Sequence, residues 1–273
     1  MPKMKMPEVL ENEYMDVAGP QAGRGHLVRL ELSPRKVRAV LNGVSVADSR
    51  RVALLHETGH LPVYYFPKDD VRMDMLTRTE HSSHCPFKGD ATYWSIEVPD
   101  RVAENAVWGY ENPISDASEL SNYVAFYWSK LDSWFEEDDE VFVHARDPYT
   151  RVDVLHSSRH VRVVLSGETV ADTIRPRLLF ETGLPTRYYL PRADVRMELL
   201  QPTATSSRCP YKGIASYYSA EVSGQTHEDI AWTYDAPIPE CPKIESLVCF
   251  FNEKVDELWV DDKRQERPDT HWA

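Results

Sequence analysis

Short stretches of the chain alternate between hydrophobic and polar residues. Val37, Ala39 and Leu41 occupy every second position, which is the period of a β-strand. Asn42 and Gly43 follow them, and both residue types tolerate the positive φ of a tight hairpin turn. Similar patterns predict further strands at Val52–His56, Pro62–Phe66, Ala91–Val98 and Glu104–Tyr110. The body of the protein is therefore predicted to be mainly β.

A second pattern, with hydrophobic residues three and four positions apart, follows Pro113. It is carried by Leu120, Tyr123, Val124, Tyr127, Leu131 and Trp134. Such spacing places side chains on one face of an α-helix and predicts a helix over Ser118–Glu136. The same spacing recurs later and predicts a second helix over Ile244–Val260.

Both patterns belong to a larger repetition. Cys209 lies 124 positions after Cys85, and Trp232 lies 124 positions after Trp108. In the same register "RKVRAVLNGVSVAD" matches "RHVRVVLSGETVAD", and "YYFPKDDVRM" matches "YYLPRADVRM". The register holds without a gap from about residue 27 to about residue 132, so the chain is a tandem duplication.

Each copy is long enough to bury a hydrophobic core of its own. We expect a first domain at 25–139 and a second at 140–264, each an α+β unit of strands closed by one C-terminal helix. The acidic run at 136–140 is predicted to be a solvated joint. Residues 1–24 and 265–273 are predicted to be extensions, partly disordered.

The net charge and the placement of the cysteines limit the classes of protein to which the chain can belong. The net charge of −13 disfavours nucleic-acid binding, because phosphate backbones would be repelled. No hydrophobic run approaches the ~20 residues of a membrane span, and the N-terminus lacks the apolar core of a secretory signal. Two of the four cysteines, Cys85 and Cys209, occupy equivalent repeat positions, which is not the spacing of a disulfide framework. A cytoplasmic location is therefore expected.

One segment of each copy is distinctive. "CPFKG" at 85–89 precedes Tyr93-Trp94, and "CPYKG" at 209–213 precedes Tyr217-Tyr218. With "ENAVWGY" and "YVAFYWSKLDSWFEED", these segments resemble the domain of unknown function 427 family. The resemblance implies a compact, mostly β fold of the tent or open-barrel kind, and no reaction. A nucleotidyltransferase label is attached to the family, but the sequence lacks the glycine-rich phosphate loop and paired metal-binding carboxylates of such enzymes.

"HETGH" at 56–60 matches the zinc-protease pattern H-E-x-x-H. That mechanism requires a helix, whereas "RVALL" before it predicts a strand and Gly59 predicts a turn. The second copy has "FETGL", so the shared element is Glu-Thr-Gly. We therefore predict no cofactor and no zinc-bearing helix. A non-proteolytic zinc site is the alternative. Its candidate ligands in the first copy are His56, His60, His81, His84 and Cys85, and the second copy has Phe180, Leu184, Thr205, Arg208 and Cys209 at these positions.

Cys85 and Cys209 each precede a proline and lie three residues before a lysine that could lower the pKa of a thiol. They could be nucleophiles, or small buried residues before a tight turn. His84 adjoins Cys85, but neighbours on a strand point to opposite faces.

Charged residues recur at four equivalent positions: Arg38 and Arg162, Glu57 and Glu181, Arg72 and Arg196, Lys88 and Lys212. Aromatic residues accompany them in the first copy at Tyr64, Tyr65, Tyr93, Trp94 and Trp108. Aromatic walls with a few convergent charges are typical of a small-ligand site. The alternative is a structural Arg–Glu pair within an aromatic core. The predicted pocket consists of Arg38, Glu57, Tyr64, Arg72, His84, Lys88 and Trp94.

The function predicted from this pocket is that of a small-molecule enzyme without an organic cofactor. Glu57 or His84 would move a proton, and Arg72 or Lys88 would hold an anionic group. Isomerisation, cyclisation or hydrolysis of a polar or anionic aromatic metabolite would each fit. The remaining predicted ligand contacts are Arg38, Tyr64, Tyr93, Trp94, Trp108 and Cys85. The first copy is favoured because it alone has His84 and Trp94. The alternative is a ligand-binding or scaffold protein without chemistry.

Overall fold

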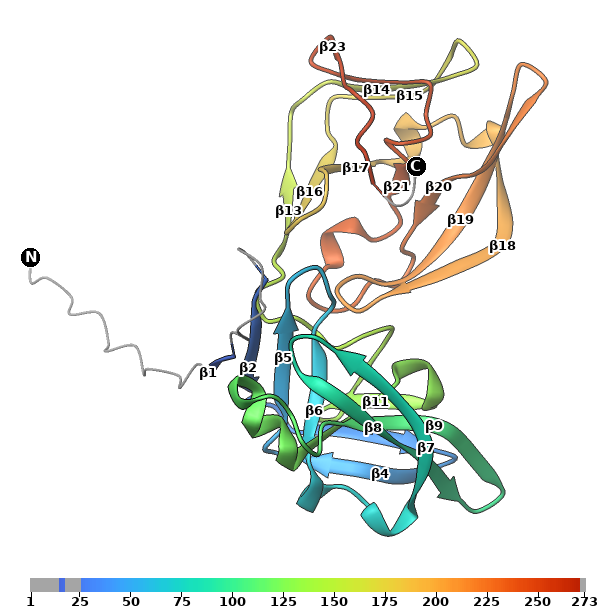
Figure 1. Cartoon of the computed structure of the whole chain (residues 1–273). Coiled ribbons are helices and arrows are strands. Elements are labelled where there is room, and N and C mark those ends of the chain that lie inside the picture. The colour runs from blue at the N-terminus through green and yellow to red at the C-terminus, as the bar shows by residue number, and fades with distance from the viewer. Residues whose placement is uncertain (1–14, 18–25, 271–273) are drawn as a thin grey trace, which may run out of the picture. The chain divides into compact units, whose positions relative to one another are not determined.

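The computed structural model describes residues 15–17 and 26–270, and the chain folds into two units with their boundary between Ala145 and Arg146. Each unit is built from one long and one short antiparallel sheet (Figure 1). The expectation that the N-terminus carries no secretory signal concerns residues outside those described, as does most of the predicted extension 1–24.

The long sheet of the first unit has eight strands. In spatial order they are β1 (Met15–Val17), β2 (Val28–Leu32), β5 (Ala53–Glu57), β6 (Val63–Pro67), β10 (Tyr123–Phe126), β9 (Arg101–Gly109), β8 (Gly89–Val98) and β7 (Leu76–Cys85). The short sheet consists of β12 (Asp139–Val141), β11 (Ser133–Glu136), β3 (Val37–Leu41) and β4 (Val44–Ser49).

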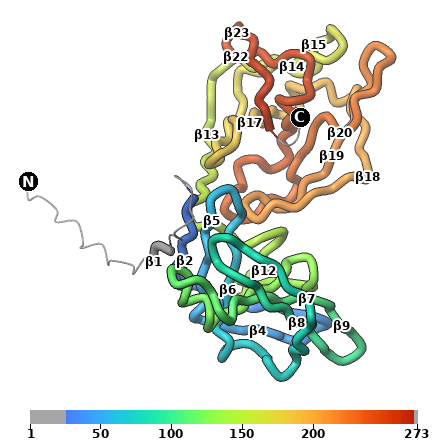
Figure 2. The backbone as a smooth tube through the Cα atoms, in the orientation of Figure 1, coloured from blue at the N-terminus to red at the C-terminus, as the bar shows by residue number. Residues whose placement is uncertain are grey.

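The second unit repeats this order without a counterpart of β1 among the described residues. Its long sheet is β13 (Val152–His156), β16 (Arg177–Glu181), β17 (Arg187–Leu190), β21 (Val248–Phe250), β20 (Gln225–Thr233), β19 (Gly213–Val222) and β18 (Leu200–Cys209). Its short sheet is β15 (Glu168–Thr173), β14 (Val161–Leu165), β22 (Glu257–Val260) and β23 (Lys263–Arg264). Figure 2 follows the curled path of the long sheets along the chain. Register shifts at equivalent points of β7–β8 and β18–β19 accompany the bend, as bulges do.

The long sheet of the first unit carries a hydrophobic cluster on each face. Tyr64 and Trp94 belong to the cluster between the two sheets, and Tyr65 and Tyr93 belong to the cluster on the opposite face. Neighbouring residues of a strand separate in this way because their side chains alternate between faces. We call the second cluster, which contains Tyr65 and Tyr93, the outer cluster.

The predicted C-terminal helix is not confirmed. In place of a helix over Ser118–Glu136, the 3₁₀-helix η3 (Ser115–Asn122) leads into β10, and a further 3₁₀ turn, η4 (Trp128–Lys130), leads into β11. In the second unit η7 (Pro242–Ile244) precedes β21 and β22. The hydrophobic spacing has another cause: Leu120 is buried in the outer cluster, whereas Val124 and Trp134 are buried between the sheets.

The structure resolves three other expectations. The acidic run 136–140 is not a joint, because it forms the β11–β12 hairpin of the first unit. Residues 265–270 pack on the second unit, where Thr270 donates a 2.7 Å hydrogen bond to Glu253. The predicted hairpin turn is confirmed, with φ of 48° at Asn42 and 74° at Gly43. Among the described residues, no helix is long and apolar enough to cross a membrane.

Candidate functional site

The "CPFKG" segment forms a tight turn that positions Lys88 beside the outer cluster. Cys85 pairs with Gly89 at the end of the β7–β8 hairpin, and the N–H of Lys88 donates to the carbonyl of Cys85 at 3.2 Å. Gly89 has φ of +100° and bridges Pro113, while the carbonyl of Lys88 accepts from Ile114 at 3.2 Å. The glycine is required because a side chain rarely adopts that φ and would press on the backbone of the next segment.

Substituting this glycine is expected to destabilise the first unit. In Gly89→Ala the new Cβ would lie 3.3 Å from the N of Ile114, in a backbone conformation unfavourable to alanine. We expect a loss of about 1–3 kcal/mol. Gly43→Ala is the control, because Gly43 also has positive φ but no atom within 4 Å of the added Cβ. Equal melting temperatures for the two variants would show that the close approach at Gly89 has no energetic effect.

Lys88 forms a largely buried ion pair with Glu57 at the end of β5. The side chains are 7% and 13% exposed, and the ammonium donates directly to Oε2 of the carboxylate. His26 Nε2 lies 3.2 Å from the other oxygen, and its ring stacks on Phe87 at 3.7 Å. Burial raises the pKa of Glu57, but the hydrogen bond and charge of Lys88 outweigh it, so the pKa is lowered. Glu57 is therefore an anion at neutral pH.

The second unit keeps this pair and surrounds it similarly. Lys212 donates to Glu181, with side chains 12% and 8% exposed. In each unit a tryptophan N–H donates to a buried tyrosine hydroxyl, from Trp108 to Tyr65 at 3.3 Å and from Trp232 to Tyr189 at 3.1 Å. The pair and its aromatic support are thus a property of both copies.

A row of four aromatic rings lies on the outer face of the first unit, and we call it the ring row: His81, Tyr93, Tyr127 and Trp108. Successive centroids are 4.3, 6.5 and 4.5 Å apart. The Tyr93 hydroxyl lies 2.7 Å from Ser83 Oγ and 3.5 Å from the Tyr127 hydroxyl. Burial raises the pKa of Tyr127 to about 12, with a contribution from the hydrogen bond to Tyr93, so its hydroxyl is uncharged.

The corresponding surface of the second unit is covered. Phe251 stands in place of Tyr127 and is 8% exposed, whereas Tyr127 is 39% exposed. The Arg187 guanidinium lies 5.6 Å from the Trp232 ring centroid, and the Lys254 ammonium lies 4.6 Å from the Phe251 centroid. Arg187 is held there by two 2.7 Å hydrogen bonds to the fully buried Glu253. The Arg187 guanidinium therefore occupies a surface that is open in the first unit, where Val63 replaces Arg187 and Lys130 is the counterpart of Lys254.

The structure brings together five of the predicted site residues: Glu57, Cys85, Lys88, Tyr93 and Trp108. Tyr65, Ala91 and Tyr93 form part of the outer cluster, against which Cys85 and Trp108 pack. Burial raises the pKa of Tyr65, and the charges of Glu57 and Cys85 add to the shift.

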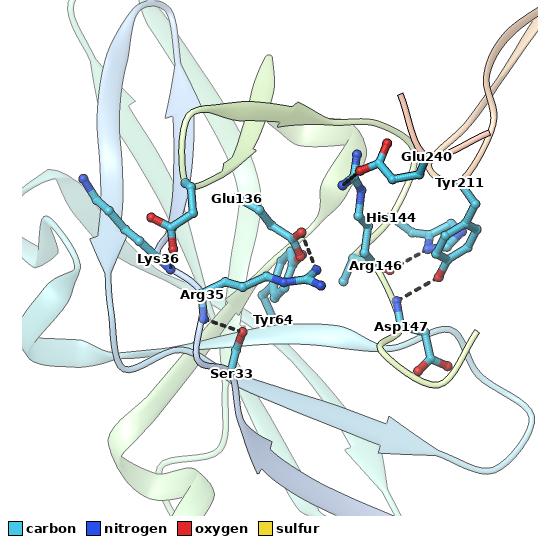
Figure 3. A network of polar contacts seen from close by, with 12 residues as sticks. Ser33, Arg35, Lys36, Tyr64, Glu136, His144, Arg146, Asp147, Tyr211 and Glu240 are labelled. Atoms are coloured by element: carbon cyan, nitrogen blue, oxygen red, sulfur yellow. Dashed lines mark hydrogen bonds and ion pairs between the residues drawn. The ribbon is translucent and has the colours of Figure 1, made fainter. Parts of the chain in front are cut away.

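The other five do not join them. Tyr64 and Trp94 lie in the cluster between the sheets, where Tyr64 donates to Glu136, the carboxylate that Arg35 also contacts (Figure 3). Arg38 is on the short sheet, 4.6 Å above the Phe135 ring. Arg72 and His84 are exposed, paired with Asp74 at 2.7 Å and Asp90 at 2.6 Å. The seven-residue pocket predicted from sequence is therefore not assembled: Glu57 and Lys88 form an ion pair, whereas Tyr64 and Trp94 share the cluster between the sheets.

The "HETGH" segment is not a helix, as predicted: it comprises the end of β5 and the turn that follows. His56 lies 3.7 Å from Glu31. Within the described part of the chain, no group of three His, Cys, Asp or Glu residues is placed to hold a metal ion.

The sequence pattern does not predict Tyr127 or Ser83 as site residues, and it offers His81 only as a candidate zinc ligand. It places Tyr127 in a helical stripe. The signal that could have found it is the comparison of copies, since Tyr127 becomes Phe251 and His81 becomes Thr205 while Tyr93 stays a tyrosine.

A family model described as a domain of unknown function (DUF427) matches the chain twice, at residues 29–137 and 153–261. Both bounds differ by 124 (153 − 29 and 261 − 137), the offset of the internal repeat. A comparison with curated proteins found no match.

Proposed function

Because the chain belongs to the domain of unknown function 427 family, whose description states no activity, we propose a function from the site alone: the first unit binds a small organic molecule on its ring row. The observation that carries this proposal is the difference between Tyr127 and Phe251. These residues occupy equivalent positions of the same fold, but Tyr127 is exposed and Phe251 is buried.

The composition of the ring row supports binding. Three of its rings belong to Tyr93, Trp108 and Tyr127, which offer flat apolar faces together with polar atoms. The hydroxyls of Ser83, Tyr93 and Tyr127 form a hydrogen-bonded series beside them. Small-ligand sites combine apolar rings with a few polar groups in this way.

Binding is favoured over the enzymatic interpretation by the state of the charged pair. A general base works best with a pKa near the operating pH. Glu57 has a lowered pKa and is neutralised by Lys88, so it is a poor proton carrier. An isomerase, cyclase or hydrolase is the second candidate; its proton carrier would be His81, which touches the Tyr93 ring and is replaced by Thr205 in the second copy.

The cytoplasmic location stays part of the proposal. It is supported by the four cysteines, Cys85, Cys209, Cys241 and Cys249, all of which are free thiols.

The test is ligand-observed NMR with neutral ring probes: phenol, indole and benzamide. Saturation transfer to at least one probe is expected with the full chain. Tyr127→Ala should weaken that binding about tenfold, which corresponds to 1.4 kcal/mol. Tyr149→Ala is the matched control, because Tyr149 is an exposed tyrosine of the second unit, and it should leave binding unchanged. Equal effects of the two substitutions would rule out the ring row as the binding surface.

A further inference from the structure

We infer that the group held by the ring row is an organic cation, with a planar guanidinium or amidinium as the best match. The inference rests on the proposed function and names the chemistry of its ligand. It comes from the second unit, where the side chain of Arg187 covers the equivalent surface.

The first step is the identity of that occupant. Arg187 places its guanidinium over Trp232, the counterpart of Trp108, and Lys254 places its ammonium over Phe251, the counterpart of Tyr127. Aromatic faces attract cations through their negative quadrupole, most strongly when water is excluded. Of these two cations the first unit retains only the lysine, as Lys130, so the Arg187 guanidinium shows which chemistry the open surface accepts.

The second step is the change that opens the first unit. Val63 occupies the position of Arg187 and packs against the outer cluster, and Ser129 occupies the position of Glu253. The guanidinium and the carboxylate that fixes it are therefore replaced together. Trp108 keeps its ring beside Tyr127 at 4.5 Å and is only partly buried. A guanidinium from outside the chain can then take the place that Arg187 has in the second unit.

The third step is the charge of the surroundings. Lys88 is neutralised by Glu57, and Arg78 of β7 is paired with Glu111 at 3.0 Å. These two cations thus already have carboxylate partners, whereas Lys130, the counterpart of Lys254, is exposed. The chain as a whole carries a net charge of −13, which attracts cations over a distance. The hydroxyls of Ser83, Tyr93 and Tyr127 add lone pairs that can accept hydrogen bonds from guanidinium N–H groups.

The experiment compares three probes that share a phenyl ring and differ in charge: benzamidinium, benzamide and benzoate. Binding to the full chain is measured by calorimetry at low and moderate salt. Benzamidinium is expected to bind at least tenfold more tightly than benzamide, with benzoate weakest, and added salt should reduce the preference. Tyr127→Ala should remove the preference for benzamidinium.

A double variant introduces the Arg187–Glu253 pair of the second unit at the equivalent positions of the first. Val63→Arg combined with Ser129→Glu should abolish benzamidinium binding, because the new guanidinium covers Trp108. Circular dichroism checks its fold, and Val63→Leu is the control for a larger side chain at that position. The three-probe comparison in the unaltered protein decides the charge preference by itself, whether or not the double variant folds.

The outcomes separate the two proposals. If benzamide or benzoate binds as tightly as benzamidinium and Tyr127→Ala weakens them all, the ring row binds ligands but the cation inference is wrong. If neutral rings bind and benzamidinium does not, the same conclusion holds. If none of the probes used in either experiment binds, both proposals fail.

Discussion

Replacing Lys88 by methionine is expected to destabilise the first unit by about 3–5 kcal/mol. The substitution keeps a long apolar side chain and removes only the charge. It leaves the carboxylate of Glu57, 13% exposed, without the cation that holds its pKa down. His26, at 3.2 Å, is a weaker partner because it is charged only when protonated. Chemical denaturation of the full chain, followed by far-UV circular dichroism, measures the loss.

Two further variants identify the cause. Lys88→Met with Glu57→Gln should recover most of the stability, because no buried charge then lacks a partner. Lys130→Met, at an exposed position, should change stability by less than about 0.5 kcal/mol. Lys212→Met should match Lys88→Met in size, since its pair with Glu181 is similarly buried. A double variant no more stable than Lys88→Met would mean that the loss comes from packing and not from charge.

The pH dependence should change sign in this variant. In the unaltered protein the folded-state pKa of Glu57 is lowered, so its contribution is complete above the unfolded value of about 4.3 and is lost as pH falls through the folded value. Without Lys88, burial dominates and raises the folded pKa. Protonation then favours the folded state, and the destabilisation of Lys88→Met should shrink as pH falls from 7 toward 4.

Strand periodicity predicts much of the fold, and it also determines which side chains can share a site. Tyr64 and Tyr65 are adjacent in sequence, and Tyr93 and Trp94 are as well, so each pair must divide between the two faces of the sheet. The predicted pocket nevertheless combined Tyr64 with residues of the outer face. The structure places Tyr64 against Trp134, with centroids 6.0 Å apart, and away from Glu57. The alternation of side chains along a strand is enough to separate Tyr64 from the residues of the outer face.

Other features had no local signal. β7 was missed because it is an edge strand whose side chains are mostly exposed on both faces, so hydrophobic residues do not alternate along it. The helical spacing after Pro113 misled because residues of η3, β10 and β11 are buried in two different clusters. Lys88 and Glu57 were selected by their recurrence in both copies. Their contact depends on the β7–β8 turn lying beside the end of β5, which long-range pairing determines.

Glu253→Ala is expected to be as damaging to the second unit as Lys88→Met is to the first, at about 3–5 kcal/mol. Arg187 is 9% exposed and makes two hydrogen bonds of 2.7 Å to this carboxylate. Its guanidinium cannot lose its proton at any ordinary pH, so the substitution leaves a buried charge. Thr270 also donates to Glu253 at 2.7 Å, and Thr270→Val should cost only about 1 kcal/mol, as expected for one hydrogen bond.

The sequence of the first unit suggests a double variant that should restore the stability of the second. Arg187→Val with Glu253→Ser installs the residue types of Val63 and Ser129, which the same fold has at these positions, and should recover most of the stability. It should also uncover Trp232, which is 8% exposed. Burial raises the pKa of Glu253, but Arg187 and Thr270 outweigh it and lower the pKa, so acid should weaken the unaltered second unit. The double variant, lacking this carboxylate, should lose less stability between pH 7 and pH 4. Denaturation of the full chain at both pH values is the measurement, and equal acid sensitivity of the two proteins would show that this pair does not stabilise the second unit.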